Sequence, residues 1–283
     1  MCMLHKVIHS CPYNDTCCAY VNHGIRQDSN EDAELIRKKC EEYGIAFYEL
    51  FIDTKIFEGK NNFEAIARKA RYDALFELKK KLNLDFLATA HHKNDQAETV
   101  FLRMARSTGL KGLRGILPER EDNVIRPMLK FTKQDLLEYA RQNNVEWRED
   151  STNKNTSHFR NKVRLQVLPK IENECPGTID SLAHIAELSQ KVYPKLIKIL
   201  NSYFNPFIVS LPVEKSLCLK HFYLPPVPGY GELFRLWLGS KSIKWEETSE
   251  DQKLYEKLQK NASFRFRLGK VSFERKKGIF YIT

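Results

Sequence analysis

The chain has 283 residues, of which 42% are hydrophobic and 29% are charged, and its formal net charge is +10. This length is enough for one large domain and a smaller one, and no apolar run approaches the roughly 20 residues of a membrane-spanning helix. The composition therefore predicts a cytoplasmic protein rather than a membrane or secreted one, and the basic balance favours a polyanionic partner.

The first half of the chain alternates candidate helices with candidate strands. The spacing of Met1, Leu4 and Ile8 fits one face of a helix over residues 1–10. Strands are expected over 17–21, 45–50 and 84–90, and helices over 30–43 and 62–82. Strands that alternate with helices imply parallel crossovers, so the expected fold class is α/β with a doubly wound parallel sheet.

The segment ATAHHKNDQAET, residues 88–99, ends the third expected strand and begins a helix with two acids. Asp95 and Glu98 are three residues apart and so face the same way, at the carboxyl end of a strand, where open α/β sheets bind ligands. Two like charges held together attract a cation, such as a substrate amine or a metal. The alternative is a capping box, in which both acids bind free backbone N–H groups. The nearby His91 and His92 favour a ligand site.

The second half of the chain predicts a helical connection to a smaller domain. Thr132 and Asp135 resemble a capping box that opens a helix. The segment 169–177 is the expected boundary, which gives a large N-terminal domain over 1–170 and a connector helix with a small C-terminal α+β domain over 171–283. The connector helix is expected over 178–204, with a kink at Pro194.

Positive charge is concentrated in two segments. Residues 103–170 hold fifteen Lys and Arg against eight Asp and Glu, and residues 261–283 hold six against one. In the second segment apolar and basic residues alternate, which predicts a strand with one basic face, between turns near Gly269 and Gly278. The alternating residues are Phe264, Arg265, Phe266, Arg267 and Leu268. Such surfaces are typical of contacts to a nucleic-acid backbone, although charge alone does not distinguish RNA from DNA.

Several further segments form an ordered set of motifs. They are YVNHGIR at 20–26, EAIARKARYDAL at 64–75, ARSTGLKGLRGI at 105–116, IRPML at 125–129, WREDSTN at 147–153 and FRNKVR at 159–164. Together with the acid-bearing segment, they resemble the tRNA(Ile)-lysidine synthetase family, a branch of the N-type ATP-pyrophosphatase (PP-loop) superfamily. Agreement of several motifs over roughly the first 170 residues is more specific than any single motif.

The resemblance implies an adenine nucleotide alpha hydrolase-like fold and a ligase activity. The expected reaction joins L-lysine to the wobble cytidine of the CAU anticodon of tRNA(Ile), through an adenylated cytidine. ATP enters as its Mg²⁺ complex, no zinc or iron–sulfur cluster is expected, and a homodimer is expected by analogy. The family's phosphate-binding loop, Ser-Gly-Gly-x-Asp-Ser, would precede Met1, so we expect the given sequence to lack the first strand and this loop. A start assigned too late, a true truncation and a non-catalytic descendant are the three open explanations.

The resemblance also assigns roles to individual residues. Asp95 and Glu98 are expected to bind the lysine, and Arg71 completes the catalytic set. The residues expected near ATP or its phosphates are Arg68, Arg71, His23 and His91. The residues expected to bind tRNA are Arg126, Arg160, Lys162, Arg164, Arg265 and Arg267. Arginine suits phosphate because its planar fork donates two hydrogen bonds and stays charged.

Alternatives to these roles stay open. A salt bridge between Glu64 and Arg68 on a solvated face would explain their spacing without a ligand, and the general base is not assigned. A zinc site from His91, His92 and Asp95 has suitable ligand types but lacks the HExxH spacing.

Two other classes of function are considered. One is a non-catalytic tRNA-binding protein, and the other is a related tRNA-thiolation enzyme with paired cysteines for an iron–sulfur cluster. The seven cysteines here are odd in number and scattered and include no Cys-x-x-Cys, which favours reduced thiols. The glycines within 109–115 match neither a Walker loop nor GxGxxG, and a flexible turn that touches RNA is expected there.

Overall fold

A computed structural model describes most of the chain. The described residues are 1–10, 16–22, 29–52, 63–148, 159–209, 217–220, 222, 224, 230–241, 243, 251–260, 263–268, 270–276 and 279–282. The chain forms two compact units, Met1–Ser189 and Gln190–Thr283. The two units divide between Ser189 and Gln190, and the expected domain boundary at 170/171 stays a prediction. Among the described helices, none is long and apolar enough to cross a membrane.

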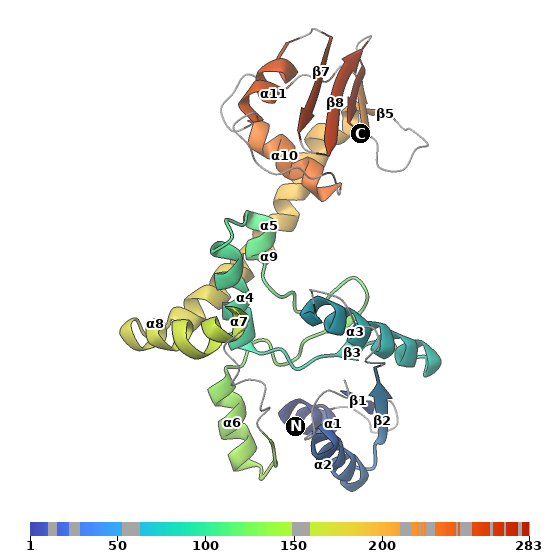
Figure 1. The fold of residues 1–283 in the computed structure, drawn as a ribbon, viewed down its shortest axis with the longest axis vertical. Coiled ribbons are helices and arrows are strands. Elements are labelled where there is room, and N and C mark those ends of the chain that lie inside the picture. Colours follow the sequence, from blue (N-terminus) through green and yellow to red (C-terminus); the bar gives the residue numbers. More distant parts are fainter. Residues whose placement is uncertain are drawn as a thin grey trace. The chain divides into compact units, whose positions relative to one another are not determined.

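The first unit begins with a helix, α1 (Cys2–Ser10), and a parallel strand pair. Strand β1 (Cys17–Asn22) pairs with β2 (Ala46–Phe51), and α2 (Ser29–Glu42) is the crossover between them (Figure 1). Three buried side chains, Ile8, Cys40 and Ile45, form the core of this part. These elements agree with the expected ones to within one or two residues, because their apolar spacing matches the surface that each buries.

A second parallel pair carries the candidate site. Helix α3 (Phe63–Lys81) leads to β3 (Leu87–Ala88), which pairs with β4 (Val124–Ile125) and is followed by α4 (Lys93–Met104). The expected strand over 84–90 is wrong in length. Only two residues have a strand partner, and Phe86 before them is 53% exposed. The alternating, parallel α/β arrangement itself is confirmed.

Helices complete the first unit. Helix α5 (Leu110–Leu113) is short, and α6 (Lys133–Gln142) begins with the expected capping box: the Asp135 N–H donates to Thr132 Oγ1 at 3.0 Å, and the Thr132 N–H donates to Asp135 Oδ2 at 2.7 Å. The elements that follow are α7 (Phe159–Lys162), the π-helical turn η4 (Val163–Val167), α8 (Leu168–Glu174) and α9 (Thr178–Phe204). Helix α9 confirms the helix expected over 178–204, and Pro194 lies inside it; its role as a connector stays a prediction.

In its described residues, the second unit is an antiparallel sheet with two helices beside the end of α9. The strands are β5 (Ile208–Val209), β6 (Leu217–Lys220), β7 (Phe264–Leu268), β8 (Val271–Lys276) and β9 (Ile279–Ile282), in the order β5-β6-β9-β8-β7. The helices are α10 (Tyr230–Ser240) and α11 (Asp251–Leu258), and a 3₁₀ turn, η5 (Asn205–Phe207), follows α9. The expected turn glycines, Gly269 and Gly278, lie outside the described residues.

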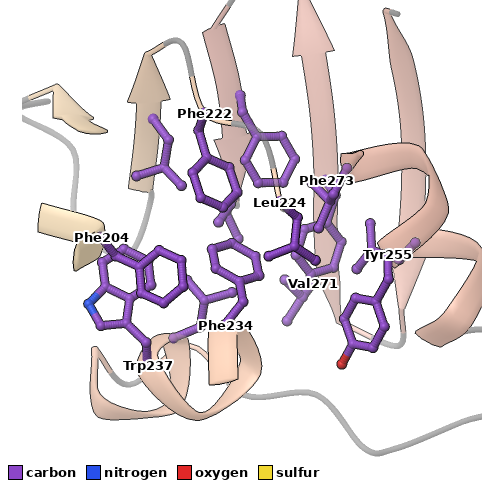
Figure 2. Packing of buried hydrophobic residues seen from close by; sticks show 14 of the residues in the cluster. Phe204, Phe222, Leu224, Phe234, Trp237, Tyr255, Val271 and Phe273 are labelled. Atoms are coloured by element: carbon purple, nitrogen blue, oxygen red, sulfur yellow. The ribbon is translucent and has the colours of Figure 1, made fainter. Parts of the chain in front are cut away.

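An aromatic core holds the second unit together. Figure 2 shows Phe204 from the end of α9 beside Trp237 and Phe234 of α10, with ring centroids 4.9 Å apart for Phe204 and Trp237. Phe222 stacks on Phe234 at 4.9 Å, and the Trp237 indole N–H donates to Asn201 at 3.1 Å. Buried aromatic side chains of this size contribute much of a small domain's stability. The end of α9 is thereby fixed to the sheet of its own unit.

Candidate active site

Two buried carboxylates lie on the first turns of α4. His92 is the N-cap, the Asp95 N–H donates to its ring at 3.4 Å, and the His92 N–H donates to Asp95 Oδ2 at 3.0 Å. The capping box therefore consists of His92 and Asp95, and Glu98 takes no part in it. Asp95 and Glu98 are 8% and 2% exposed. Capping accounts for one oxygen of Asp95 and for neither oxygen of Glu98.

Two arginines contact this carboxylate pair. Arg164 donates from Nε to Glu98 Oε1 at 2.6 Å and from Nη2 to Glu98 Oε2 at 3.0 Å. The same Nη2 donates to Asp95 Oδ1 at 2.8 Å, and Arg160 Nε donates to Glu98 Oε2 at 3.2 Å. Although burial lowers the pKa of Arg164, its hydrogen bonds to Glu98 and the charges of both acids raise it overall. The two negative charges are thus balanced by two guanidinium groups.

The helical backbone explains why Arg160 and Arg164 act together. The sequence suggested a basic run at alternate positions, but α7 and η4 place residues four apart on one side. Lys162, between them, is exposed. Arg160 and Arg164 were expected to bind tRNA; the structure instead shows them bound to the acid pair. A tRNA contact by any of the three stays a prediction.

His91 lies beside this cluster as a neutral imidazole. Its Nδ1 is 3.0 Å from the hydroxyl of Thr89, which follows β3. Burial lowers the pKa of His91 to about 4; the charge of Asp95 opposes this shift, and the charges of Arg126, Arg68 and Arg160 add to it. At neutral pH the imidazole can therefore donate a hydrogen bond from one ring nitrogen and accept one at the other, and it adds no positive charge to the site.

Helix α3 presents arginines to the same region. Arg68 stacks on the Tyr72 ring, with its guanidinium carbon 5.1 Å from the centroid, and Arg120 stacks on that ring at the same distance. Arg71 is exposed. The alternative Glu64–Arg68 salt bridge involves a side chain that lies outside the described residues, as does all of His23. Their expected roles stay predictions.

The glycine-rich segment is held by α4 rather than being a loose turn. Gln96 Nε2 donates to the Ile116 carbonyl at 2.9 Å, and the Ile116 N–H donates to Gln96 Oε1 at 2.6 Å. Arg103 Nη1 donates to the carbonyls of Gly112 and Gly115 at 2.7 and 3.0 Å. The sequence placed Gln96 among the polar residues that crowd the turn beside the acid pair, but its contact with the glycine-rich segment and that of Arg103 were not predicted. Both residues lie on α4 together with the acid pair, and this shared helix was the signal in the sequence that could have identified them.

Arg126 is also an interior residue. It follows β4, is 6% exposed, and donates from Nη1 to the Leu117 carbonyl at 2.5 Å. It was expected to contact tRNA, but its guanidinium is covered by protein. Arg265 and Arg267, by contrast, are exposed on β7 as expected, and Arg265 donates to Glu274 Oε1 of β8 at 3.1 Å. Their contact to tRNA stays a prediction.

Metal ligands and thiols add nothing to this site within the described residues. There, no group of three or more His, Cys, Asp or Glu side chains is placed to hold a metal ion. Five cysteines of that part of the chain are free thiols: Cys2, Cys17, Cys18, Cys40 and Cys175. Burial, more than any other cause, raises the pKa of Cys18 to about 12, which keeps this thiol protonated and unreactive.

Known proteins resemble this chain over the same region. The family model of the PP-loop domain matches residues 1–171. The tRNA(Ile)-lysidine synthase of Clostridium tetani is 37% identical over 177 residues, which cover 61% of this chain and 38% of that protein. The Bacillus licheniformis tRNA(Ile)-lysidine synthase is 36% identical over 233 residues, which cover 77% of this chain and 49% of that protein. The chain thus spans less than half the length of these relatives.

A solved structure agrees in fold. A U34-tRNA thiolase from Methanococcus maripaludis, solved with its [4Fe-4S] cluster, superimposes with a TM-score of 0.54 at 20% identity, over 66% of this chain and 67% of that one. This degree of identity supports the α/β architecture of the first unit and no more. Because the family model matches well over half of the sequence, this chain belongs to the PP-loop domain family.

Proposed function

We propose that this protein is a tRNA(Ile)-lysidine synthetase of the cytoplasm. It would join L-lysine to the wobble cytidine of the CAU anticodon of tRNA(Ile) at the expense of ATP. The observation that carries the proposal is the buried pair Asp95 and Glu98 at the start of α4. The resemblance of the chain to tRNA(Ile)-lysidine synthases, over 177 and 233 residues in two relatives, supports the choice of substrates.

The carboxylate pair fits the ammonium group of lysine. An ionised carboxylate has about four lone-pair sites. Asp95 receives hydrogen bonds from the His92 N–H and from Arg164, so acceptor positions remain. Its side chain is 11% exposed, against 2% for Glu98. Asp95 is therefore the better placed of the two to contact the ammonium, while Glu98 holds Arg160 and Arg164.

The reaction would take place in two steps. The oxygen at position 2 of the cytosine attacks the α-phosphorus of ATP, and pyrophosphate leaves. The ε-amine of lysine then attacks carbon 2, and the oxygen departs with AMP. Arg68, Arg71 and His91 would be close to the nucleotide, together with His23, and guanidinium groups would offset negative charge that develops on phosphate. Lys162, Arg265 and Arg267 are the exposed residues proposed to contact tRNA.

Lysine transfer by an Asp95 variant tests this proposal. Asp95→Asn keeps the size of the side chain but removes the charge that attracts an ammonium. With protein made at its native locus, we expect incorporation of radiolabelled lysine into tRNA(Ile) to fall by at least about 100-fold, which corresponds to about 3 kcal/mol of lost charge-assisted contact. The affinity for tRNA should stay within about twofold of the wild-type value.

Asp135→Asn is the matched control. Asp135 occupies the same third position of the capping box on α6, where it is exposed. Its variant should lose a comparable capping contact and still transfer lysine. Equal losses of lysine transfer in the two variants would mean that Asp95 acts through the helix cap, and the proposed lysine site would be wrong. Loss of tRNA binding together with lysine transfer would favour the non-catalytic, tRNA-binding alternative.

A further inference from the structure

Arg126 is a buried guanidinium with few partners. It follows β4 at the carboxyl end of the β3–β4 pair and is 6% exposed. Its Nη1 donates to the Leu117 carbonyl at 2.5 Å, and its Nε has no hydrogen-bond partner within the described residues. No carboxylate of those residues forms an ion pair with it. A guanidinium has five N–H donors, and within the described residues this one makes a single side-chain hydrogen bond, to Leu117.

Such an arrangement is costly in the absence of a ligand. A charged group that is removed from water loses several kcal/mol of hydration unless an opposite charge compensates. A backbone carbonyl supplies only part of that compensation. Arginines with a purely structural role in an interior are ordinarily satisfied by several acceptors. Arg275 of the second unit is an example, since it donates to carbonyls of Lys260, Phe222 and Leu258.

Within the described residues, the acids next to His91 are engaged by arginines other than Arg126. The positive charges of Arg126, Arg68 and Arg160 all act on His91, and Asp95 is the acid that opposes them. Asp95 and Glu98 are already engaged by Arg160 and Arg164. Within the described residues, Arg126 is therefore left without an acidic partner. His91 stays neutral at physiological pH, so it adds a hydrogen-bonding group without adding charge.

We propose that Arg126 is an interior ligand for a phosphate-type oxyanion, which binds at the carboxyl ends of β3 and β4 with Arg68 and His91. A small anion fits this role better than a tRNA backbone, because only a small ligand reaches a side chain that is so well covered. The identity of the anion rests on the proposed function, in which it is pyrophosphate or the polyphosphate of ATP.

The test is the binding of inorganic pyrophosphate, measured calorimetrically with the full chain in the absence of lysine and tRNA. Arg126→Met should weaken binding by about 10-fold or more, since a charge-assisted hydrogen bond is worth about 1.5–3 kcal/mol. Without pyrophosphate, the same variant should unfold at the wild-type temperature or above it, because methionine removes a buried, poorly compensated charge.

Arg103→Met is the matched control. Arg103 also donates to loop carbonyls, at Gly112 and Gly115, but its charge is not among those that act on His91. Its variant should lose stability and keep the wild-type affinity for pyrophosphate. If Arg126→Met behaved in that way, Arg126 would be a structural residue and the proposal would be overturned. Failure of the wild-type protein to bind pyrophosphate would overturn it as well.

Two further arms complete the test. Arg126→Lys keeps the positive charge but loses the planar guanidinium fork, so this variant, when folded, should also bind pyrophosphate about 10-fold more weakly. Wild-type affinity in Arg126→Lys would contradict the proposal. This holds even if Arg126→Met fails to fold. The affinity for tRNA should not change in either variant. Parallel losses of tRNA and pyrophosphate binding would assign Arg126 to a tRNA phosphate instead. The pyrophosphate-binding assay contains no lysine. Its result therefore tests the role of Arg126 even if the proposed lysine site is wrong.

Discussion

Arg164 and Glu98, 66 residues apart in the chain, share two hydrogen bonds: Nε to Oε1 at 2.6 Å and Nη2 to Oε2 at 3.0 Å. Removal of Arg164 leaves the buried Glu98 with Arg160 as its cationic partner, and removal of Glu98 leaves Arg164 with Asp95, so each single variant loses part of the charge compensation. We expect Glu98→Gln and Arg164→Met each to lower the free energy of unfolding by about 2 kcal/mol, and the double variant to lose less than the sum. Urea denaturation of all four proteins would give the coupling energy, expected to be about 1–2 kcal/mol.

The exposed pair Lys69 and Asp73 serves as the control for this cycle. Their charged atoms are 3.6 Å apart, and their side chains are 82% and 63% exposed. Water screens such a pair, so its coupling should be below about 0.5 kcal/mol. Equal coupling in the two cycles would show that Glu98 and Arg164 are not held together in solution.

Gly115→Ala tests the contact between α4 and the glycine-rich segment. Gly115 has φ +57°, and a Cβ there would lie 2.4 Å from Gln96 Oε1. Alanine would therefore break the paired hydrogen bonds between Gln96 and Ile116, and we expect a loss of about 3 kcal/mol in the free energy of unfolding. Gly44→Ala is the matched variant, because Gly44 has φ +66° with nothing within 4 Å. It should lose only about 1 kcal/mol, and comparable losses would exclude the steric explanation.

The stability of the first unit should depend on pH through His91. Its folded pKa is about 4, below the ordinary value of 6.5. Between these two values the unfolded chain binds more protons, so stability rises with pH from 4 to 6.5 and is independent of His91 above that range. The contribution is about 3 kcal/mol at most. His91→Gln should flatten this part of the profile of unfolding free energy against pH, and an unchanged profile in this variant would contradict the prediction.

Bound pyrophosphate should raise the pKa of His91. An anion near Arg126 and Arg68 would offset the positive charges that now lower it. The expected result is an upward shift of the His91 titration midpoint in NMR spectra when pyrophosphate is added. In Arg126→Met the pyrophosphate-dependent shift should be much smaller. If the titration midpoint of His91 in the wild-type protein did not change when pyrophosphate was added, the anion would bind elsewhere.

The basic face of β7 should contribute to tRNA binding. Glu274→Gln releases Arg265 from its ion pair and removes a negative charge from the sheet. We expect this variant to bind tRNA more tightly and with a steeper dependence on salt, because one more phosphate contact becomes available. Arg267→Ala should have the opposite effect on both quantities. Filter binding over a series of salt concentrations measures them, and identical salt slopes in all three proteins would remove β7 from the interface.

Sequence periodicity predicted the helices and strands of the first unit well where one element buries one face. Helix α2 and strands β1 and β2 are examples, and the capping box of α6 followed from Thr132 and Asp135 alone. The predicted strand over 84–90 was too long. The segment is rich in apolar residues, but a strand extends only as far as its hydrogen-bonded partner. Strand β4 pairs with β3 at two residues.

The sequence by itself determined that Asp95 and Glu98 share a helix face, because i and i+3 spacing is a local property of the backbone. The tertiary structure decided what those acids meet. Arg160 and Arg164 come from a segment more than 60 residues away, and only folding brings them to 2.6–3.2 Å from the carboxylates. The sequence also did not predict the burial of Arg126, because it shows that a charged residue is present but not whether that residue is exposed. Local spacing is set by bond geometry, whereas charge pairing and desolvation depend on which distant segments share a core.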